Sequence, residues 1–236
     1  MSEGALSGRV ALVTGASRGI GKAIAKRFAA EGAHVVALAR TVGALEELDD
    51  EITLAGGQVT LVTCDLCEFE AIDTLGPVLL ERFGKLDILV ANAGALGEMT
   101  PLTHYDAQPW HEVFDVNVHA NWRLIRTLDP LLRKSDAGRA IFVSSGAARN
   151  PRAFWGAYAV TKAALETLAK VWASEVQNSS VRVNVVNPGA TRTGMRAAAF
   201  PGEDPLSLKT PEEITGAFVE LASPACTKHG AIIDLG

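Results

Sequence analysis

The sequence is poor in cysteine and in excess basic charge, and it lacks a long apolar run. Its three cysteines are too few for a framework of disulfides. Lysine and arginine total 22 residues against 27 aspartate and glutamate residues, and the net charge of -5 argues against a nucleic-acid partner. No stretch approaches the roughly 18 apolar residues of a membrane span, and the N-terminal residues hold no signal-peptide core. We therefore expect a cytoplasmic protein that binds neither nucleic acid nor membrane.

Two of the cysteines, Cys64 and Cys67, have the CxxC spacing of redox and metal motifs. A zinc site needs two further ligands, and the sequence offers neither a second CxxC nor a nearby pair of histidines. The competing interpretation places one cysteine at the end of a buried strand and the other at the start of a helix. We adopt that interpretation and expect no metal site.

Short apolar runs alternate with helix-length amphipathic segments along the chain. Strands buried on both faces read as continuous apolar runs, and alternation with helices places them in a parallel sheet that is covered on both sides. The pattern predicts one α/β domain, residues 1–236, with a doubly wound, seven-stranded parallel sheet. The expected strands are 10–13, 34–38, 59–62, 88–91, 140–143, 181–186 and 231–233. The expected helices are 20–30, 45–54, 69–83, 110–132, 157–176 and 211–221.

One long stretch, residues 188–210, shows no clear period and contains several glycines and prolines. Long irregular segments in a compact domain often serve as lids or substrate loops. We expect this stretch to be a substrate-binding loop.

A glycine-rich turn at residues 14–21 (TGASRGIG) follows the first expected strand and opens the first helix. There, unpaired backbone N–H groups and the positive end of the helix dipole point at one spot, where a pyrophosphate can bind. Glycines alone are also compatible with a simple tight turn, but the position between a strand and a helix favours a dinucleotide site. The cofactor-binding residues expected here are Gly15, Ser17, Arg18, Gly19, Ile20 and Gly21.

The second expected strand lacks, at its end, the acidic residue that usually holds the ribose hydroxyls of NAD. Arg40 begins the loop where the adenosine 2′ position should lie. Arg18 stands at a helix N-terminus, where a cation is unfavourable unless it meets an anion. Two solvated surface arginines are the alternative interpretation. We expect a 2′-phosphate, and hence a preference for NADP(H), with use of NAD(H) left open.

Tyr158 and Lys162 lie four residues apart at the start of an expected helix, so their side chains share one face. A free tyrosine has a pKa of about 10, and a neighbouring ammonium together with the nicotinamide's positive charge is expected to lower it toward working pH. Such a pair also arises by chance on solvated helices.

Ser144 and Ser145 follow the fifth expected strand, at the carboxyl end of the sheet, where open α/β folds bind ligands. Asn117 falls in mid-helix and, taken alone, is interpreted as an incidental surface residue.

In their order along the chain, these motifs resemble those of the short-chain dehydrogenase/reductase family, in its single-domain branch of roughly 250 residues. The resemblance runs nearly from end to end and implies a Rossmann-like fold. Some short sequence segments also resemble those of a bacterial subgroup of oxidoreductases that has no assigned substrate. The matched motifs are the glycine-rich turn, Asp65-Leu66, Asn92-Ala93-Gly94, Ser145, Tyr158 with Lys162, and Pro188-Gly189.

The resemblance also implies a role for each catalytic residue. Ser145, at the family's usual distance before the tyrosine, is implied to hydrogen-bond the substrate oxygen, with Ser144 as its neighbour. Tyr158 acts as general acid or base, and Lys162 tunes it and holds the nicotinamide ribose. Asn117 is implied to hold a water relay to Lys162, which reverses its interpretation above. The implied cofactor contacts are Asp65, Leu66, Asn92, Ala93, Gly94, Tyr158, Lys162, Pro188, Gly189 and Thr191.

The implied activity is reversible hydride transfer between NADP(H) and a small carbonyl or alcohol substrate. Four arginines, Arg149, Arg152, Arg192 and Arg196, are compatible with an acidic substrate, although a solvated rim is the preferred interpretation. The residues expected to line an apolar substrate pocket are Leu96, Gly97, Ala147, Trp155, Ala190, Met195 and Phe200.

Two other functions compete with this one. A dinucleotide-sensing regulator with little or no turnover would have no need for the intact Ser145, Tyr158 and Lys162. A sugar-nucleotide epimerase or dehydratase normally needs a substrate domain after the sheet, which we do not expect here. By analogy with the family, a homodimer or homotetramer is expected to form through residues 110–132 and 157–176.

Overall fold

The computed structural model describes residues 4–236, so that residues 1–3 of the expected domain lie outside the described residues. Among the described residues, seven strands form one parallel sheet in the order β3-β2-β1-β4-β5-β6-β7. The strands are β1 (Val10–Thr14), β2 (His34–Ala39), β3 (Gln58–Thr63), β4 (Ile88–Ala91), β5 (Arg139–Val143), β6 (Arg182–Asn187) and β7 (Ile232–Asp234). The expected Rossmann-like, doubly wound α/β fold is confirmed.

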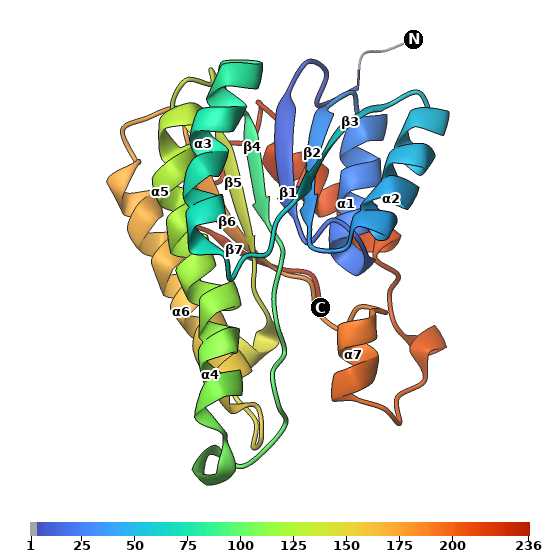
Figure 1. Ribbon diagram of the computed structural model, residues 1–236, viewed down its shortest axis with the longest axis vertical. Coiled ribbons are helices and arrows are strands. Elements are labelled where there is room, and N and C mark those ends of the chain that lie inside the picture. Colours follow the sequence, from blue (N-terminus) through green and yellow to red (C-terminus); the bar gives the residue numbers. More distant parts are fainter. Residues whose placement is uncertain (1–3) are drawn as a thin grey trace.

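Helices cover both faces of the sheet (Figure 1). The longer ones are α1 (Gly19–Ala30), α2 (Val42–Leu54), α3 (Phe69–Phe83), α4 (Ala107–Phe114), α5 (Ala120–Leu132), α6 (Gly156–Glu175) and α8 (Thr215–Ala222). On one face, α1, α2 and α8 contribute buried side chains such as Phe28 and Phe218. On the other face, α3, α5 and α6 contribute Leu128 and Trp172. The central strands β1, β2, β4, β5 and β6 are mostly buried, because helices cover both of their faces, whereas the edge strands β3 and β7 stay partly exposed.

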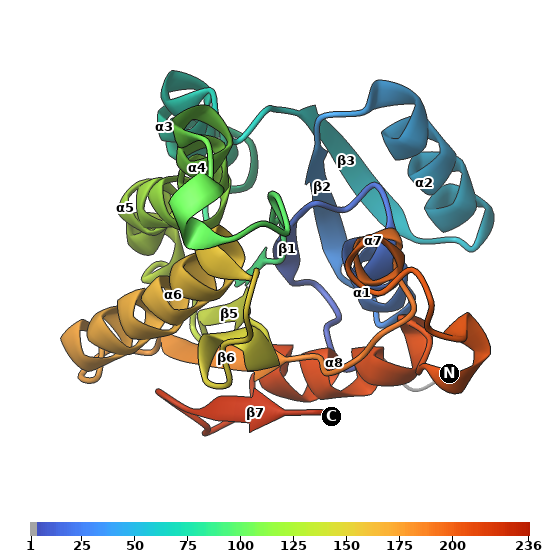
Figure 2. The ribbon, with the colours of Figure 1, turned by 90° about the horizontal axis from the view of Figure 1, so that it is seen from below.

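The path of the chain through the sheet reverses beside β1. The chain moves outward from β1 to β2 and β3 and then returns to form β4 on the other side of β1. Open α/β folds bind their ligands next to such a reversal, at the carboxyl ends of the strands. The loops that leave β1 to β6 at this end carry most of the predicted site residues, and Asn117, Tyr158 and Lys162 lie on helices. Figure 2 looks onto this end of the sheet.

Two expected elements are divided differently in the structure. The expected helix 110–132 consists of α4, a π-helical segment (Asp115–His119) and α5. The expected irregular stretch 188–210 contains α7 (Gly194–Ala199) and a 3-10 turn (Pro205–Ser207). A helix as short as α7 shows no hydrophobic period in the sequence. In the structure Thr193 caps its N-terminus, since the Thr193 hydroxyl accepts a hydrogen bond from the amide of Arg196 at 3.1 Å.

The remaining short turns are 3-10 in character and lie at Leu102–His104, Gly146–Ala148 and Glu212–Ile214. The last of these precedes α8, so the expected helix 211–221 begins with a 3-10 turn and becomes α-helical only at Thr215. Within residues 4–236, no helix combines the length and the apolar character that crossing a membrane requires.

Candidate active site

The glycine-rich turn connects β1 to α1 as the sequence predicts. Gly15 and Gly19 have φ angles of 66° and 55°, in the left-handed region that glycine enters without strain. A Cβ on Gly21 would collide with the carbonyl oxygen of Gly15, so the first turn of α1 packs directly on the loop. Arg18 precedes the helix and does not cap it with its side chain. The arrangement leaves the first N–H groups of α1 facing a spot that suits an anion.

The loop after β4 is fastened to this turn by Asn92. Its side-chain amide donates hydrogen bonds to the carbonyl oxygens of Thr14, at 2.9 Å, and Gly15, at 3.4 Å. In return, the buried hydroxyl of Thr14 accepts from the backbone amides of Asn92 and Ala93, both at 3.0 Å. Asn92 and Ala93 therefore fix the conformation of the glycine-rich turn. The direct contacts with a cofactor that were expected of these two residues stay a prediction.

Arg40 and Asp65 meet at the ends of β2 and β3. Arg40 Nη1 lies 3.4 Å from Asp65 Oδ2, and 68% of the Arg40 side chain stays exposed. Arg18, in the glycine-rich turn, is also exposed. The side chain of Leu66 packs into the core, so a contact with a cofactor falls to its backbone. The two arginines thus keep mobile, solvated guanidinium groups on the surface where the adenosine half of a dinucleotide is expected.

The CxxC pair shows no sign of redox activation. Burial, and secondarily the neighbouring carboxylates, raise the pKa of the Cys64 and Cys67 thiols. Reactive cysteines show the opposite shift, because the thiolate is the reactive form. Among residues 4–236, no group of three or more histidine, cysteine, aspartate or glutamate side chains is placed to hold a metal ion. The pair therefore offers no chemistry to the site.

Tyr158 and Lys162 lie on the buried face of α6. The lysine is 3% exposed and the tyrosine 8%. Lys162 Nζ donates a hydrogen bond to the carbonyl oxygen of Val143 at 2.8 Å and lies 5.8 Å from the centre of the Tyr158 ring. Val143 ends β5 two positions before Ser145. The lysine thus ties α6 to the strand end that carries Ser145.

The pKa of Tyr158 is raised in the chain alone. Burial of the hydroxyl raises its pKa, and a hydrogen bond with Ser145 opposes this effect only in part. Burial also lowers the pKa of Lys162 to about 8. The expected lowering depends on the lysine together with the nicotinamide's positive charge, and it stays a prediction for the cofactor-bound protein. In the chain alone, desolvation of the phenolate is the largest influence on the pKa of Tyr158. In this state Tyr158 is a protonated donor.

Asn117 is completely buried in the π-helical segment, and the interpretation of this residue as a surface accident is wrong. Its Oδ1 accepts from the amide of Ala95 at 2.8 Å. Its Nδ2 donates to the carbonyl of Ala95 at 2.9 Å and to the hydroxyl of Thr161 at 3.0 Å. Thr161 precedes Lys162 on α6, so Asn117 connects the loop after β4 with the helix that carries Tyr158 and Lys162. π-Helical segments occur often at functional sites.

Gly94, which has no side chain, lets the loop after β4 pass close to Asn117 and Lys162. A Cβ at this position would lie 3.3 Å from both Asn117 Oδ1 and Lys162 Nζ. The loop after β4 therefore passes directly over the two side chains. The expected neighbourhood of Gly94, Asn117 and Lys162 is present, whereas the water relay between the last two stays a prediction.

The residues expected around the substrate gather in part. The rings of Trp155 and Tyr158 are 5.8 Å apart, and those of Trp155 and Phe200 are 5.5 Å apart, so one aromatic side chain connects the end of α7 with Tyr158. Leu96 and Ala147 are half-buried, whereas Ala190 and Met195 are exposed. Gly97 lies against Tyr105 and Val113, a packing contact on the α4 side.

Three of the four arginines near these loops already have partners. Arg196 pairs with both carboxylate oxygens of Glu203 at 2.6 Å. Arg149 lies 3.0 Å from an Asp234 oxygen, and Arg192 donates to the carbonyl of Leu208 at 3.4 Å. The remaining one, Arg152, is exposed, and its guanidinium lies 5.8 Å from the centre of the Phe200 ring. These contacts favour the interpretation of the arginines as a structural and solvated rim.

The turn after β6 is tightly packed. Gly189 has a φ of 71°, and a Cβ there would lie 2.7 Å from the Cα of Gly236. Thr191 is buried, and its hydroxyl donates to the carbonyl of Pro188 at 3.2 Å. The turn is therefore firmly packed at the carboxyl end of β6, and Thr193, which follows it, lies 3.4 Å from where a Cβ on Gly19 of the glycine-rich turn would be.

Comparison with known proteins decides the family. Residues 9–204 match the family model of short chain dehydrogenases. The chain belongs to the short chain dehydrogenase family. The expectations of this family and of an oxidoreductase are thereby confirmed.

Individual short chain dehydrogenases match nearly the whole chain. The Escherichia coli K12 oxidoreductase YciK, which is itself uncharacterized, is 43% identical over 219 residues, covering 92% of this chain and 86% of YciK. The 7alpha-hydroxysteroid dehydrogenase of Escherichia coli K12 is 31% identical over 234 residues, covering 94% of this chain and 90% of the relative. A short chain dehydrogenase from Escherichia coli CFT073, solved in complex with NADPH, is 40% identical with a TM-score of 0.95, covering 100% of this chain and 99% of that one.

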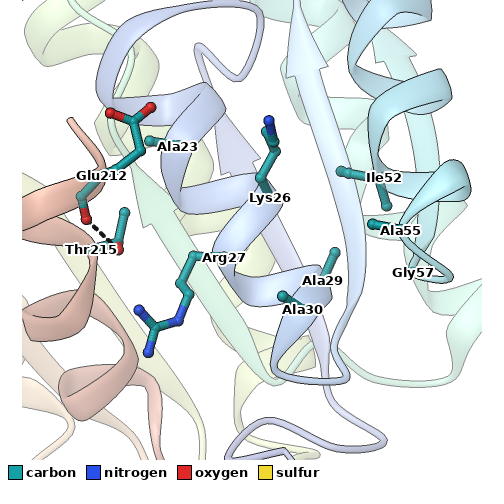
Figure 3. A pocket seen from close by; sticks show the side chains of 10 residues that line it. All are labelled: Ala23, Lys26, Arg27, Ala29, Ala30, Ile52, Ala55, Gly57, Glu212 and Thr215. Atoms are coloured by element: carbon teal, nitrogen blue, oxygen red, sulfur yellow. Dashed lines mark hydrogen bonds between the residues drawn. The ribbon is translucent and has the colours of Figure 1, made fainter. Parts of the chain in front are cut away.

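A hollow on the outer side of α1 lies apart from the site of this short chain dehydrogenase (Figure 3). It is lined by the later turns of α1 and by residues next to α2 and α8, and none of the predicted site residues reaches it. Its cations are already paired, since Lys26 lies 2.6 Å from Glu51 and Arg27 lies 2.9 Å from Glu31. The hollow therefore offers no chemistry of its own.

Sequence reasoning missed three groups that shape the site of this short chain dehydrogenase. They are the hydroxyls of Thr14 and Thr161 and the carbonyl oxygen of Val143. Thr161 had a usable signal, because it stands between Tyr158 and Lys162 on one helical turn. The carbonyl of Val143 had none, since every residue carries such a group and only the packing of α6 on β5 selects this one.

Proposed function

We propose that the chain catalyses reversible hydride transfer between NADP(H) and a carbonyl or alcohol substrate, with Tyr158 as general acid and base. The observation that carries the proposal is the buried arrangement of Tyr158 and Lys162 on α6, with Ser145 close enough to the tyrosine to lower its pKa. Acid–base catalysis needs a donor placed within reach of the reacting oxygen. The hydroxyls of Ser145 and Tyr158 supply two groups that converge on one such oxygen.

Each residue has a defined task in the reduction. Ser145 donates a hydrogen bond to the carbonyl oxygen and orients it, and Tyr158 Oη transfers its proton to the same oxygen as the alcohol forms. The ammonium of Lys162 stabilises the phenolate that remains, and the Val143 carbonyl keeps that ammonium in place. When bound, the reduced nicotinamide supplies the hydride for the carbonyl carbon. In the reverse direction, the phenolate of Tyr158 accepts the proton of the alcohol.

The site has features that fit a bound dinucleotide with a 2′-phosphate. The turn of Gly15, Gly19 and Gly21 presents the N-terminus of α1, where a pyrophosphate is stabilised. No carboxylate follows β2, and Arg40 stands there instead. The solved relative with NADPH and a Shigella flexneri relative solved with NADP support the same choice of cofactor. Thr191, in the turn after β6, is the expected contact for the nicotinamide carboxamide.

Combined replacement of Arg18 and Arg40 by alanine is expected to weaken NADPH binding about ten- to a hundredfold while leaving NADH binding nearly unchanged. One charge-assisted hydrogen bond to a phosphate contributes about 1.5–3 kcal/mol, about ten- to a hundredfold in affinity, and because both guanidinium groups are exposed and screened by solvent we expect their combined loss to stay in this range. Fluorescence titration of the two reduced cofactors measures the change. Arg27→Ala, which removes an exposed arginine from the last turn of α1, is the matched control. Equal losses for both cofactors would contradict a 2′-phosphate contact.

The substrate is expected to lie under residues 188–210. Phe200, at the end of α7, contacts Trp155, which in turn contacts Tyr158. Movement of α7 would therefore change the aromatic packing beside Tyr158. The residues proposed to line the apolar pocket are Leu96, Ala147, Trp155, Ala190 and Met195. The aromatic and aliphatic character of this set favours an apolar carbonyl compound.

A screen of aldehydes, ketones and diketones with the purified protein tests the proposal, with NADPH and NADH in parallel and with loss of the reduced nicotinamide as readout. We expect turnover with at least one class of carbonyl compound and faster turnover with NADPH. If neither cofactor is oxidised by any compound although NADPH binds, the result favours the alternative of a dinucleotide-sensing regulator. A strong preference for NADH would contradict the roles of Arg18 and Arg40.

The protein is also expected to form a homodimer or homotetramer in the cytoplasm. The helices that would pair are α4, α5 and α6, and they expose the large apolar side chains Trp122, Val160 and Val171 to solvent. Apolar side chains exposed on helices are typical of surfaces buried in assemblies. Light scattering coupled to size-exclusion chromatography gives the mass of the assembly. A monomer at high micromolar concentration would contradict this expectation.

A further inference from the structure

A buried carboxylate lies behind the catalytic residues. Glu166 follows Lys162 by one turn of α6 and is only 6% exposed. Its Oε1 accepts a hydrogen bond from the hydroxyl of Ser144 at 2.8 Å, and Arg149 Nε lies 3.7 Å from the same oxygen. Burying a carboxylate is costly unless hydrogen bonds and a countercharge compensate. Both compensating groups come from one short loop, which begins at the end of β5.

That loop is the one that carries Ser145. Ser144 directly precedes Ser145, and Arg149 directly follows the 3-10 turn Gly146–Ala148. The Ser145 hydroxyl also accepts from the amide of Ala147 at 3.2 Å, so the loop has an internal bond as well as the two contacts with Glu166. Glu166 therefore holds the loop at both of its ends, from the same helix that presents Tyr158 and Lys162.

The far side of Arg149 is anchored too. Its Nη2 lies 3.0 Å from Asp234 Oδ2, at the end of β7. The other oxygen of Asp234 accepts from the side-chain amide of Asn187 at 2.9 Å, at the end of β6. Arg149 is thus held between α6 and two strand ends, which restricts the loop more than a single exposed ion pair can.

We propose that Glu166 is a positioning residue that fixes Ser145 against Tyr158 by accepting the hydrogen bond of Ser144. Ser145 contacts the substrate oxygen in the proposed function, on which this inference rests, whereas Glu166 acts only through the loop. The hydrogen bond carries the effect, and Arg149 neutralises the buried charge. The carboxylate is therefore replaceable by a neutral acceptor of the same shape.

Three variants test the role of Glu166. Glu166→Ala removes the acceptor and is expected to lower kcat about ten- to a hundredfold, the loss that follows a misplacement of a catalytic group by about 1 Å or less. KM for NADPH should stay within about twofold, because the glycine-rich turn is untouched. Glu166→Gln keeps the acceptor and is expected to restore kcat to within about threefold of the wild-type value. Glu175→Ala, which removes an exposed carboxylate from the end of the same helix, is the control and should leave kcat unchanged.

The outcomes separate positioning from general stabilisation. A Glu166→Ala protein that keeps wild-type kcat overturns the proposal, as does a Glu166→Gln protein that is as slow as the alanine variant. A loss confined to KM for NADPH also overturns it. Melting temperatures of all three variants show whether the decrease in kcat reflects a smaller fraction of folded protein. If kcat decreases only in proportion to that fraction, the result contradicts a positioning role.

A second readout keeps this test independent of the proposed function. Hydrogen exchange at the Ala147 amide reports the order of the Ser145 loop without any substrate. We expect faster exchange there in Glu166→Ala and near wild-type exchange in Glu166→Gln. If the wild-type protein turned over no carbonyl compound, the proposed function would fail, yet the exchange result would still decide whether Glu166 orders the loop.

Discussion

Replacement of Tyr158 by phenylalanine is expected to lower kcat for carbonyl reduction about a thousandfold, within the 10²–10⁴-fold range typical of a positioned general acid. The change removes one hydroxyl and keeps the ring, which packs against Trp155 at 5.8 Å. We therefore expect an unchanged fold and NADPH binding within about threefold of the wild-type affinity. Steady-state kinetics at saturating NADPH, a melting curve and a cofactor titration on one preparation measure the three quantities.

The raised pKa of Tyr158 explains why the effect should be large in the direction of reduction. Because burial disfavours the phenolate, the hydroxyl carries its proton throughout the neutral pH range and is ready to donate. Oxidation of an alcohol needs the phenolate instead. The rate of oxidation should therefore rise with pH above neutrality while the rate of reduction does not, and this contrast vanishes in Tyr158→Phe.

The other tyrosine provides the matched control. Tyr105 Oη accepts a hydrogen bond from the amide of Glu98 at 2.9 Å, near α4 and away from Lys162. Tyr105→Phe removes the same atom from the same residue type and should leave kcat within about threefold of the wild-type value. A Tyr158→Phe protein that retained more than a tenth of the wild-type kcat would show that another group delivers the proton.

The fold was predictable because its signals are local and repeated. An unbroken apolar run such as Ile88–Ala91 indicates a strand buried on both faces, and it was placed to the residue. The division of the helix before Leu132 was not predictable. A π-helical segment at Asp115–His119 shifts the helical register, and the contacts of Asn117 with Ala95 and Thr161 that accompany it are not visible in the sequence.

The identity of the candidate site residues was predictable from the sequence, but their burial and their pKa shifts were not. Tyr158, Lys162, Ser145 and Gly94 lie close together in the structure, whereas the roles that the resemblance implied for them stay predictions. The raised pKa of Tyr158 in the chain without cofactor was not predictable, because it depends on burial, which the sequence does not measure. Glu166 was missed because an acidic residue on a helix usually faces solvent, and only the packing of α6 on the loop after β5 turns it inward.

Replacement of Lys162 by methionine is expected to lower kcat about a hundredfold and to raise KM for NADPH. The variant keeps the aliphatic stem in its buried place and removes the ammonium that would stabilise the phenolate and hold the ribose. Loss of one preorganised donor at a reacting centre typically costs about 10²–10³ in kcat. Lys170→Met, which removes an exposed ammonium from the same helix, is the control and should change neither constant. Unaltered kcat in Lys162→Met would remove the lysine from the mechanism.

The same variant gives a test that needs no substrate, because a buried lysine links stability to pH. The folded chain holds the pKa of Lys162 at about 8, below its ordinary value of 10.5. Between these two values the unfolded chain binds the proton more strongly, so the free energy of unfolding must rise with pH, by a total of about 3 kcal/mol. Below pH 8 the full cost of the buried charge is present.

Methionine removes this link but also leaves the carbonyl of Val143 without its donor, which costs about 1–3 kcal/mol at every pH. The two effects oppose each other near neutrality, so stability at one pH is uninformative. The difference between the proteins is informative: urea unfolding followed by tryptophan fluorescence should show wild-type stability gaining on Lys162→Met from pH 7 to pH 10. A constant difference would mean that Lys162 keeps an ordinary pKa in the folded chain, and that burial does not tune it.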